Sequence, residues 1–141
     1  LNTLKDYMHE NTMVFIEVPN LNDPLISGVD IGQFRDFYYR QIHLYYFTPD
    51  SLGRLLKQEG YNFELHTSQQ ASITNHFHWM HQKSGQLNGN FMTSVVTPVD
   101  ILDGLKMREV LEKTDNYYRN LLEKNDMGDL LSARAWISNK Q

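Results

Sequence analysis

Apolar residues follow two different periods along the chain, and each period predicts a different element. Their spacing over residues 1 to 10 is helical and predicts the end of an amphipathic helix. In residues 13 to 19, both the odd and the even positions are apolar as far as Glu17. Such a run is typical of a strand covered on both faces of a parallel sheet. Pro19 cannot donate a hydrogen bond to a neighbouring strand, so we expect it to end this one.

Residues 20 to 47 show no clear period and read as a long connection with short helical turns around residues 33 to 40. A connection of this length in a compact domain is often a lid or a binding segment. It carries a dense aromatic group: Phe34, Phe37, Tyr38, Tyr39, Tyr45, Tyr46 and Phe47. These rings could stack on a ligand or could only cover the sheet, and the sequence leaves both readings open.

The clearest boundary is Thr48-Pro49, where a capping side chain precedes a proline suited to the first helical position. This predicts a helix with a buried leucine stripe that ends at Gly60 in a left-handed conformation. Residues 61 to 66 alternate between apolar and polar and predict a half-buried, edge-like strand.

The remainder of the chain predicts a further strand and then helices. We expect a strand over 75 to 83, a polar linker or loop over 84 to 99, a long helix from 100 to about 124, and a last short helix over 130 to 137. The order of elements predicts half of an α/β layered sheet with helical additions.

Composition narrows the functional classes. The chain has 141 residues, enough for one domain, with 40% hydrophobic residues. Its net charge of −4 gives no basic excess to neutralise phosphates, so we expect no nucleic-acid partner. Apolar runs are too short for a membrane helix, and the absence of cysteine excludes disulfides and thiolate chemistry. These features are compatible with the cytoplasm. Because Leu1 enters a helical pattern at once, the chain is expected to be a piece of a longer protein.

Few motifs in the sequence indicate a catalytic, metal-binding or phosphate-binding site. The glycines form neither a G-x-G-x-x-G turn nor a phosphate-binding loop. His76 and His78, with His66, could bind a metal, but no acidic ligand has a fixed relation to them, and we expect no metal site. His43 lies between the aromatic connection and the capped helix, where a histidine could serve as a general base or could be structural.

Two stretches together resemble class I S-adenosylmethionine-dependent methyltransferases. Val14-Phe15-Ile16-Glu17-Val18-Pro19-Asn20 resembles the end of their fifth strand. The segment from His43 to Leu52, followed by Leu55-Leu56 and Gly60-Tyr61, resembles their "H-x-x-Y-F-T-x-x-S-L…L-L…G-F" segment before the sixth strand. The resemblance covers about residues 1 to 83.

The resemblance implies a partial Rossmann-like sheet. In the family, a seventh strand runs antiparallel between the fifth and the sixth. Residues 13–19, 61–69 and 75–83 would then be strands five, six and seven. Residues 1–83 would be the carboxyl-terminal half of a methyltransferase domain, 84–99 a linker or loop, and 100–141 a helical extension.

The resemblance also implies the function. The parent protein would transfer a methyl group from S-adenosylmethionine to a small-molecule acceptor. The family's cofactor-binding elements would precede Leu1, so this fragment is expected to supply the substrate side, to bind no cofactor alone and to be inactive by itself. His43 would be catalytic, and Tyr45, Tyr46 and Tyr39 would contact the substrate. A sugar-modifying subgroup has an acidic residue just before the histidine, where this chain has Ile42, so a catalytic dyad does not transfer.

The alternative is a non-catalytic α/β binding or dimerisation module. A partial sheet exposes a strand edge that can recruit another chain. We therefore expect a homo-oligomer, or a missing amino-terminal half that completes the sheet.

Overall fold

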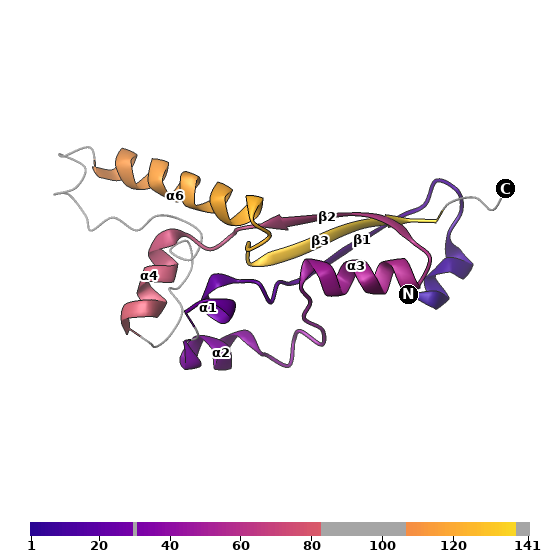
Figure 1. Ribbon diagram of the computed structural model, residues 1–141, viewed down its shortest axis with the longest axis horizontal. Helices are drawn as coiled ribbons and strands as arrows, with labels where there is room; N and C mark the ends of the chain where they lie inside the picture. Colours follow the sequence, from indigo (N-terminus) through magenta and orange to yellow (C-terminus); the bar gives the residue numbers. More distant parts are fainter. Residues whose placement is uncertain (30, 83–106, 138–141) are drawn as a thin grey trace.

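The computed structural model describes residues 1–29, 31–82 and 107–137 as a mixed α/β fold (Figure 1). A short 3-10 helix, η1, precedes the first strand. The elements are η1 (Asn2–Tyr7), β1 (Met13–Pro19), α1 (Pro24–Ser27), α2 (Gly32–Tyr38), α3 (Pro49–Gln58), β2 (Asn62–Ser68), α4 (Ile73–Gln82), α6 (Met107–Lys124) and β3 (Leu130–Trp136). The expected linker over 84–99 lies outside the described residues.

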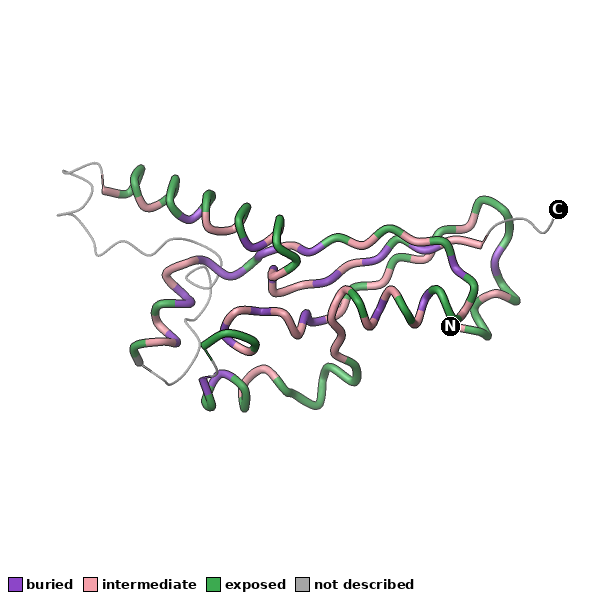
Figure 2. Tube along the Cα trace, in the orientation of Figure 1, coloured by how far each residue is buried: buried purple, intermediate pink, exposed green. Residues whose placement is uncertain are grey.

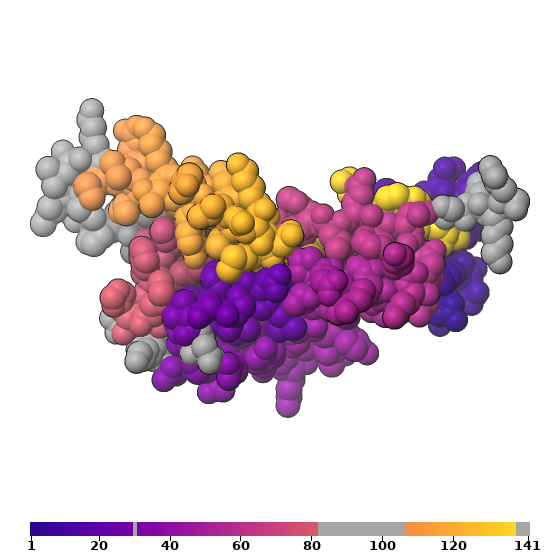
Figure 3. All heavy atoms as spheres, in the orientation of Figure 1, coloured from indigo at the N-terminus to yellow at the C-terminus, as the bar shows by residue number. Residues whose placement is uncertain are grey.

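The described strands form one sheet in the order β1-β3-β2. β3 is antiparallel to both neighbours, with Ile16 and Leu65 opposite Ala133. β1 and β2 are therefore parallel to each other, and their carboxyl ends point to the same end of the sheet (Figure 1). The helices α1, α2, α4 and α6 gather at that end, where Figure 3 shows their atoms side by side.

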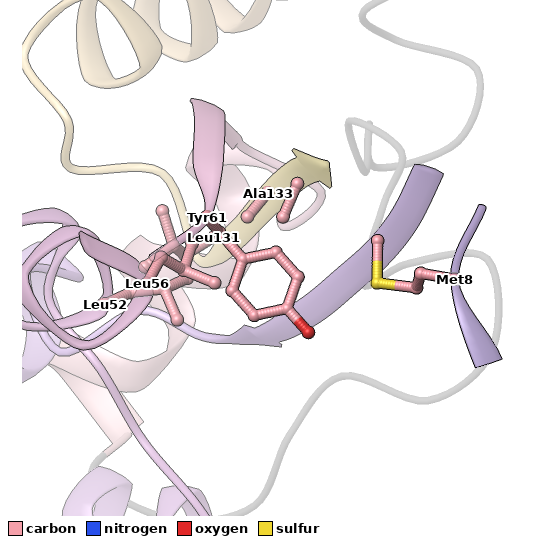
Figure 4. Close-up of a cluster of buried hydrophobic side chains, with 7 residues drawn as sticks. Met8, Leu52, Leu56, Tyr61, Leu131 and Ala133 are labelled. Carbon is pink, nitrogen blue, oxygen red and sulfur yellow. The ribbon is translucent and has the colours of Figure 1, made fainter. Parts of the chain in front are cut away.

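One face of the sheet is covered by α3. Leu52 and Leu56 of this helix pack on Leu131 and Ala133 of β3 (Figure 4). The alanines of β3 leave room for the helix to lie close to the sheet, and Tyr61 closes the cluster beside them. Burial of these side chains supplies the main hydrophobic stabilisation of the sheet.

The opposite face of the sheet is open to solvent (Figure 2). Met13 and Phe15 of β1 are 57% and 64% exposed. The middle row of this face places Phe15, Arg134 and Glu64 side by side, and Arg134 pairs with Glu64 at 2.9 Å. The prediction that β1 is covered on both faces is therefore wrong for the described residues.

The local signals around α3 are confirmed. The Thr48 hydroxyl accepts the Ser51 N–H at 3.1 Å, and the Ser51 hydroxyl accepts the Thr48 N–H at 2.9 Å, which forms a capping box. Gly60 follows the helix with φ of +72°, a conformation that favours glycine. The strand predicted from residue 61 is β2, and it lies at an edge of the described sheet.

Two predicted elements are wrong. The strand predicted over 75–83 is wrong for its described part, because Ile73–Gln82 forms α4, which begins where the Ser72 hydroxyl accepts the Asn75 N–H. Residues 130–137 are not a helix: Leu130–Trp136 is the central strand β3. Its alanines favour a helix intrinsically, but pairing on both sides and packing under α3 outweigh that preference. The segment expected as a helical extension thus contains α6 and then returns to the sheet.

None of the helices in the described ranges combines the length and the apolar character that crossing a membrane requires.

Candidate functional site

A cavity of about 340 Å³ lies where the three strands meet the helical group. Pro19 at the end of β1, Ala71 after β2 and Leu130 at the start of β3 line it. The carboxyl ends of parallel strands are the usual position of ligand sites in open α/β sheets, because the chain diverges there into helices. The volume suits a small molecule.

The turn between β1 and α1 is held by buried polar side chains. The Asn20 amide donates to the carbonyl oxygens of Asp126 (3.0 Å) and Gly128 (2.7 Å), which ties the end of β1 to the turn before β3. Asp23 then begins α1: its Oδ1 accepts the Leu25 N–H at 2.7 Å. This aspartate is only 1% exposed and lines the cavity.

Burial makes Asp23 an unusual acid. Loss of hydration raises its pKa from 3.8 to about 7, the Leu25 N–H opposes the shift, and the charge of nearby Asp129 adds to it. A carboxyl group with this pKa can gain or lose a proton near neutral pH, as general bases and acids do.

A second network joins Asp129 to the loop after β2. Its two carboxylate oxygens accept the N–H groups of Gln70 (2.9 Å) and Ala71 (2.8 Å). Burial raises its pKa, and these hydrogen bonds oppose the rise. The Gln69 Oε1 accepts the Asp129 N–H at 3.1 Å, so the Gln69 amide nitrogen faces His76.

The protonation of His76 follows from that orientation. Gln69 Nε2 can only donate, so His76 Nε2, 3.3 Å away, accepts, and His76 Nδ1 carries the proton. The Nδ1–H then donates to the Tyr118 hydroxyl at 2.6 Å. Burial and, secondarily, the charge of Arg119 lower the pKa of His76 to about 4. His76 is therefore a neutral side chain of the cavity wall at neutral pH.

Helix α6 holds the network in place through one ion pair. Arg119 Nε donates to Asp115 Oδ2 at 2.6 Å, and its Nη1 donates to the carbonyl oxygens of Gln69 and Gln70. Asp115 Oδ1 accepts the Ile73 N–H at 2.7 Å, in the first turn of α4. The pair thereby joins α6, the loop after β2 and α4.

One polar atom of the cavity wall has no partner. Asn75 is 2% exposed, and its Oδ1 makes no hydrogen bond to a described residue. A buried acceptor without a donor costs about 1–3 kcal/mol, so such atoms point to a missing ligand or water.

The opposite wall is aromatic. Phe34, Phe37 and Tyr38 line the cavity, and Trp79 packs behind Phe34 with ring centroids 5.1 Å apart. The Tyr38 hydroxyl donates to the Asn20 carbonyl at 2.6 Å, which fixes its ring against the β1–α1 turn. Arg40 lies over Phe37, with its guanidinium carbon 3.5 Å from the ring centroid.

Of the site residues predicted from sequence, His43 lines the cavity and Tyr46 contacts its aromatic wall. The His43 ring meets the edge of Tyr46 at 6.0 Å between centroids. Tyr46 donates to the Tyr38 carbonyl at 2.8 Å and accepts the Arg40 N–H at 2.9 Å.

The three tyrosines predicted to contact the substrate are not among the described residues that line the cavity. Tyr39 packs against Tyr46, with ring centroids 5.0 Å apart, while Tyr45 is 69% exposed and stacks on Phe47. Substrate contacts of Tyr39, Tyr45 and Tyr46, and catalysis by His43, stay predictions.

Sequence reasoning missed Asp23, Asn75, His76 as a cavity residue, and Asp129. Asp23-Pro24 is a capping residue followed by proline, the same signal that predicted the start of α3. It could have predicted the start of α1. The others carry no local signal, because their burial depends on α4 and α6.

S-adenosylmethionine does not fit the described residues. A cofactor turn of the Rossmann type needs glycines after a strand so that the backbone can approach the ligand closely. Here the turn after β1 is filled by Asn20 and Asp23. Gly128, the glycine near the cavity end of β3, already abuts protein: a Cβ there would meet the Ser68 carbonyl oxygen at 2.6 Å. No glycine stands among the described residues that line the cavity, so they offer no such close backbone approach to a ligand.

Comparison with protein-family models, with curated proteins and with solved structures finds no match to this chain.

Proposed function

We propose that this chain is the acceptor-binding half of a class I S-adenosylmethionine-dependent methyltransferase. The supporting observation is the sheet topology: an antiparallel strand lies between two parallel strands, as the sequence resemblance implies for strands five, seven and six. In this proposal β1 is strand five, β2 strand six and β3 strand seven, with strand seven at Leu130–Trp136 and not at 75–83.

The cavity would hold the methyl acceptor. Its position at the carboxyl ends of β1 and β2 is the one that open α/β sheets use for ligands. Cofactor binding would come from a segment outside these 141 residues. The residues of this chain would orient the acceptor and exclude water, with Asp23 and His43 as the groups able to take its proton.

The test of the function is methyl transfer by the parent protein that carries this chain. His43→Asn is expected to reduce turnover at least a hundredfold with normal folding, because loss of a general base costs 10²–10⁴ in rate. The His43 ring lines the cavity and makes no hydrogen bond to a described residue, so little stability depends on it.

His66→Asn is the matched control, since His66 is exposed on the open face of β2. Turnover of the His43 variant within threefold of the parent would remove His43 from catalysis. If the parent protein bound no S-adenosylmethionine and formed no demethylated cofactor with any acceptor, the proposed function itself would be wrong.

A second function, self-assembly through the sheet, is favoured by the open face. Met13 and Phe15 are exposed there, and among the described strands β1 pairs on one edge only. Exposed apolar faces and free strand edges recruit partners. We expect light scattering to find a dimer or larger species of the 141-residue chain. A monodisperse monomer with protected amides in β1 would contradict assembly.

A further inference from the structure

Two buried polar atoms at the cavity have no hydrogen-bond partner among the described residues: Asn75 Oδ1, an acceptor in its lining, and Trp79 Nε1, a donor behind the aromatic wall. Asp23 also lines the cavity and is as deeply buried as Asn75, and the Leu25 N–H bonds only to its Oδ1. A ligand that satisfies Asn75 and Asp23 must donate hydrogen bonds.

The cavity wall also carries negative charge that lacks a positive partner among the described residues. Asp23 and Asp129 both line the cavity, and the charged group acting on Asp23 is Asp129, with no described cation beside it. Arg119 is bonded to Asp115 and to two carbonyl groups, and Arg40 donates to the Phe37 carbonyl at 2.6 Å. A carboxylate buried without a countercharge is destabilised in its ionised form. A bound cation would supply the countercharge.

We propose that the cavity binds a small molecule through a protonated primary amine that donates hydrogen bonds to Asn75 Oδ1 and to the Asp23 carboxylate. An ammonium group has three donors and no acceptor, which complements this wall. Its carbon skeleton would lie against Phe34, Phe37 and Tyr38, whose ring faces also attract a cation.

Most titratable groups around Asp23 are compatible with a bound cation; Arg40 is positively charged and lines the cavity, but its guanidinium is held on the Phe37 ring and the Phe37 carbonyl. Asp129 adds negative charge, and burial keeps Tyr38 and Tyr118 neutral by raising the pKa of each hydroxyl. His76 is neutral and its Nδ1–H is engaged by Tyr118. Arg40 and His43 line the cavity from the segment after α2. As a statement about the methyl acceptor, this inference rests on the proposed function; as a statement about binding, it concerns the cavity alone.

The test compares cyclohexylamine with cyclohexanol, a neutral molecule of similar shape, by nuclear magnetic resonance titration of the 141-residue chain at pH 7.5. The amine is protonated at this pH. We expect its Kd to be at least tenfold lower than that of the alcohol. Asp23→Asn is expected to weaken amine binding at least tenfold, whereas Asp36→Asn, an exposed aspartate of α2, should leave it unchanged.

A measurement on the unmodified chain makes the test independent of whether the variants fold. Binding that prefers the ionised carboxylate must lower its pKa, so the titration midpoint of the ¹³C-labelled Asp23 carboxyl should fall by about one pH unit at saturating amine. Equal affinity for the two probes, or an unchanged Asp23 midpoint, would overturn the inference. If the chain binds the amine but the parent protein transfers no methyl group, the proposed function is wrong and the amine site is still supported.

Discussion

Asp23→Asn is expected to stabilise the protein strongly at pH 8 and much less at pH 5. The folded-state pKa of Asp23 is about 7 and its ordinary value is 3.8, so between these values the folded protein binds more protons than the unfolded chain. The free energy of unfolding therefore falls as pH rises through this range, by about 2–4 kcal/mol for a fully buried group. Asparagine does not ionise and can still accept the Leu25 N–H.

His76 has the opposite dependence. Its pKa is lowered from 6.5 to about 4, so its contribution is complete above pH 6.5 and is lost as pH falls toward 4. The two slopes oppose each other in the unmodified protein. Urea unfolding at pH 5 and pH 8 should show a steeper loss of stability on acidification in Asp23→Asn. Asp36→Asn serves as the exposed control, and a stability difference that is the same at both pH values would refute the burial argument.

Gly128→Ala is expected to reduce the free energy of unfolding by about 3 kcal/mol or more, at the upper end of overpacking. A Cβ at this position would meet the Ser68 carbonyl oxygen at 2.6 Å and its carbon at 2.7 Å. Both are backbone atoms at the end of β2, so neither can move away without disturbing the pairing of Ser68 with Leu130. The Gly128 carbonyl also accepts the Asn20 amide, which positions the β1–α1 turn.

Gly32→Ala is the matched substitution, because apart from its own helix and chain neighbours no described atom lies within 4 Å of a Cβ placed there. It lies in α2, where alanine is favoured over glycine, and should be neutral or stabilising. Denaturant unfolding of the two variants tests the difference. A Gly128→Ala protein within 0.5 kcal/mol of the parent would show that the two strand ends are not in contact as described.

Elements that are specified by neighbouring residues could be predicted from the sequence. The Thr48 cap and the left-handed Gly60 depend on contacts within a few positions, and the strand over 13 to 19 has a local apolar pattern; all three are confirmed. The strand β3 could not be predicted, since its alanines gain β structure only from partners distant in sequence. The segment of α4 was predicted as a strand because its histidines alternate with other residues. Ser72, which caps the helix, was the signal that favoured a helix.

The residues of the candidate site also differ in whether the sequence could predict them. His43 was found because it lies beside a strong helix boundary, and it lines the cavity. The roles of Asn75 and His76 depend on burial, which requires residues such as Tyr118 and Arg119 from α6. An asparagine or histidine has the same sequence signature whether it is buried or solvated, so no local pattern could separate them.

The central position of β3 also constrains the order in which the protein can fold during synthesis. In the described sheet β1 and β2 do not pair with each other, so neither gains its ladder of hydrogen bonds to this sheet until β3 lies between them. β3 follows both in sequence, and its pairing with β1 joins residues near opposite ends of the described chain, which carries a large loop-closure entropy. Until β3, the last described element, leaves the ribosome, β1 and β2 therefore lack their shared partner strand, and their core-facing apolar side chains are exposed to aggregation during this interval.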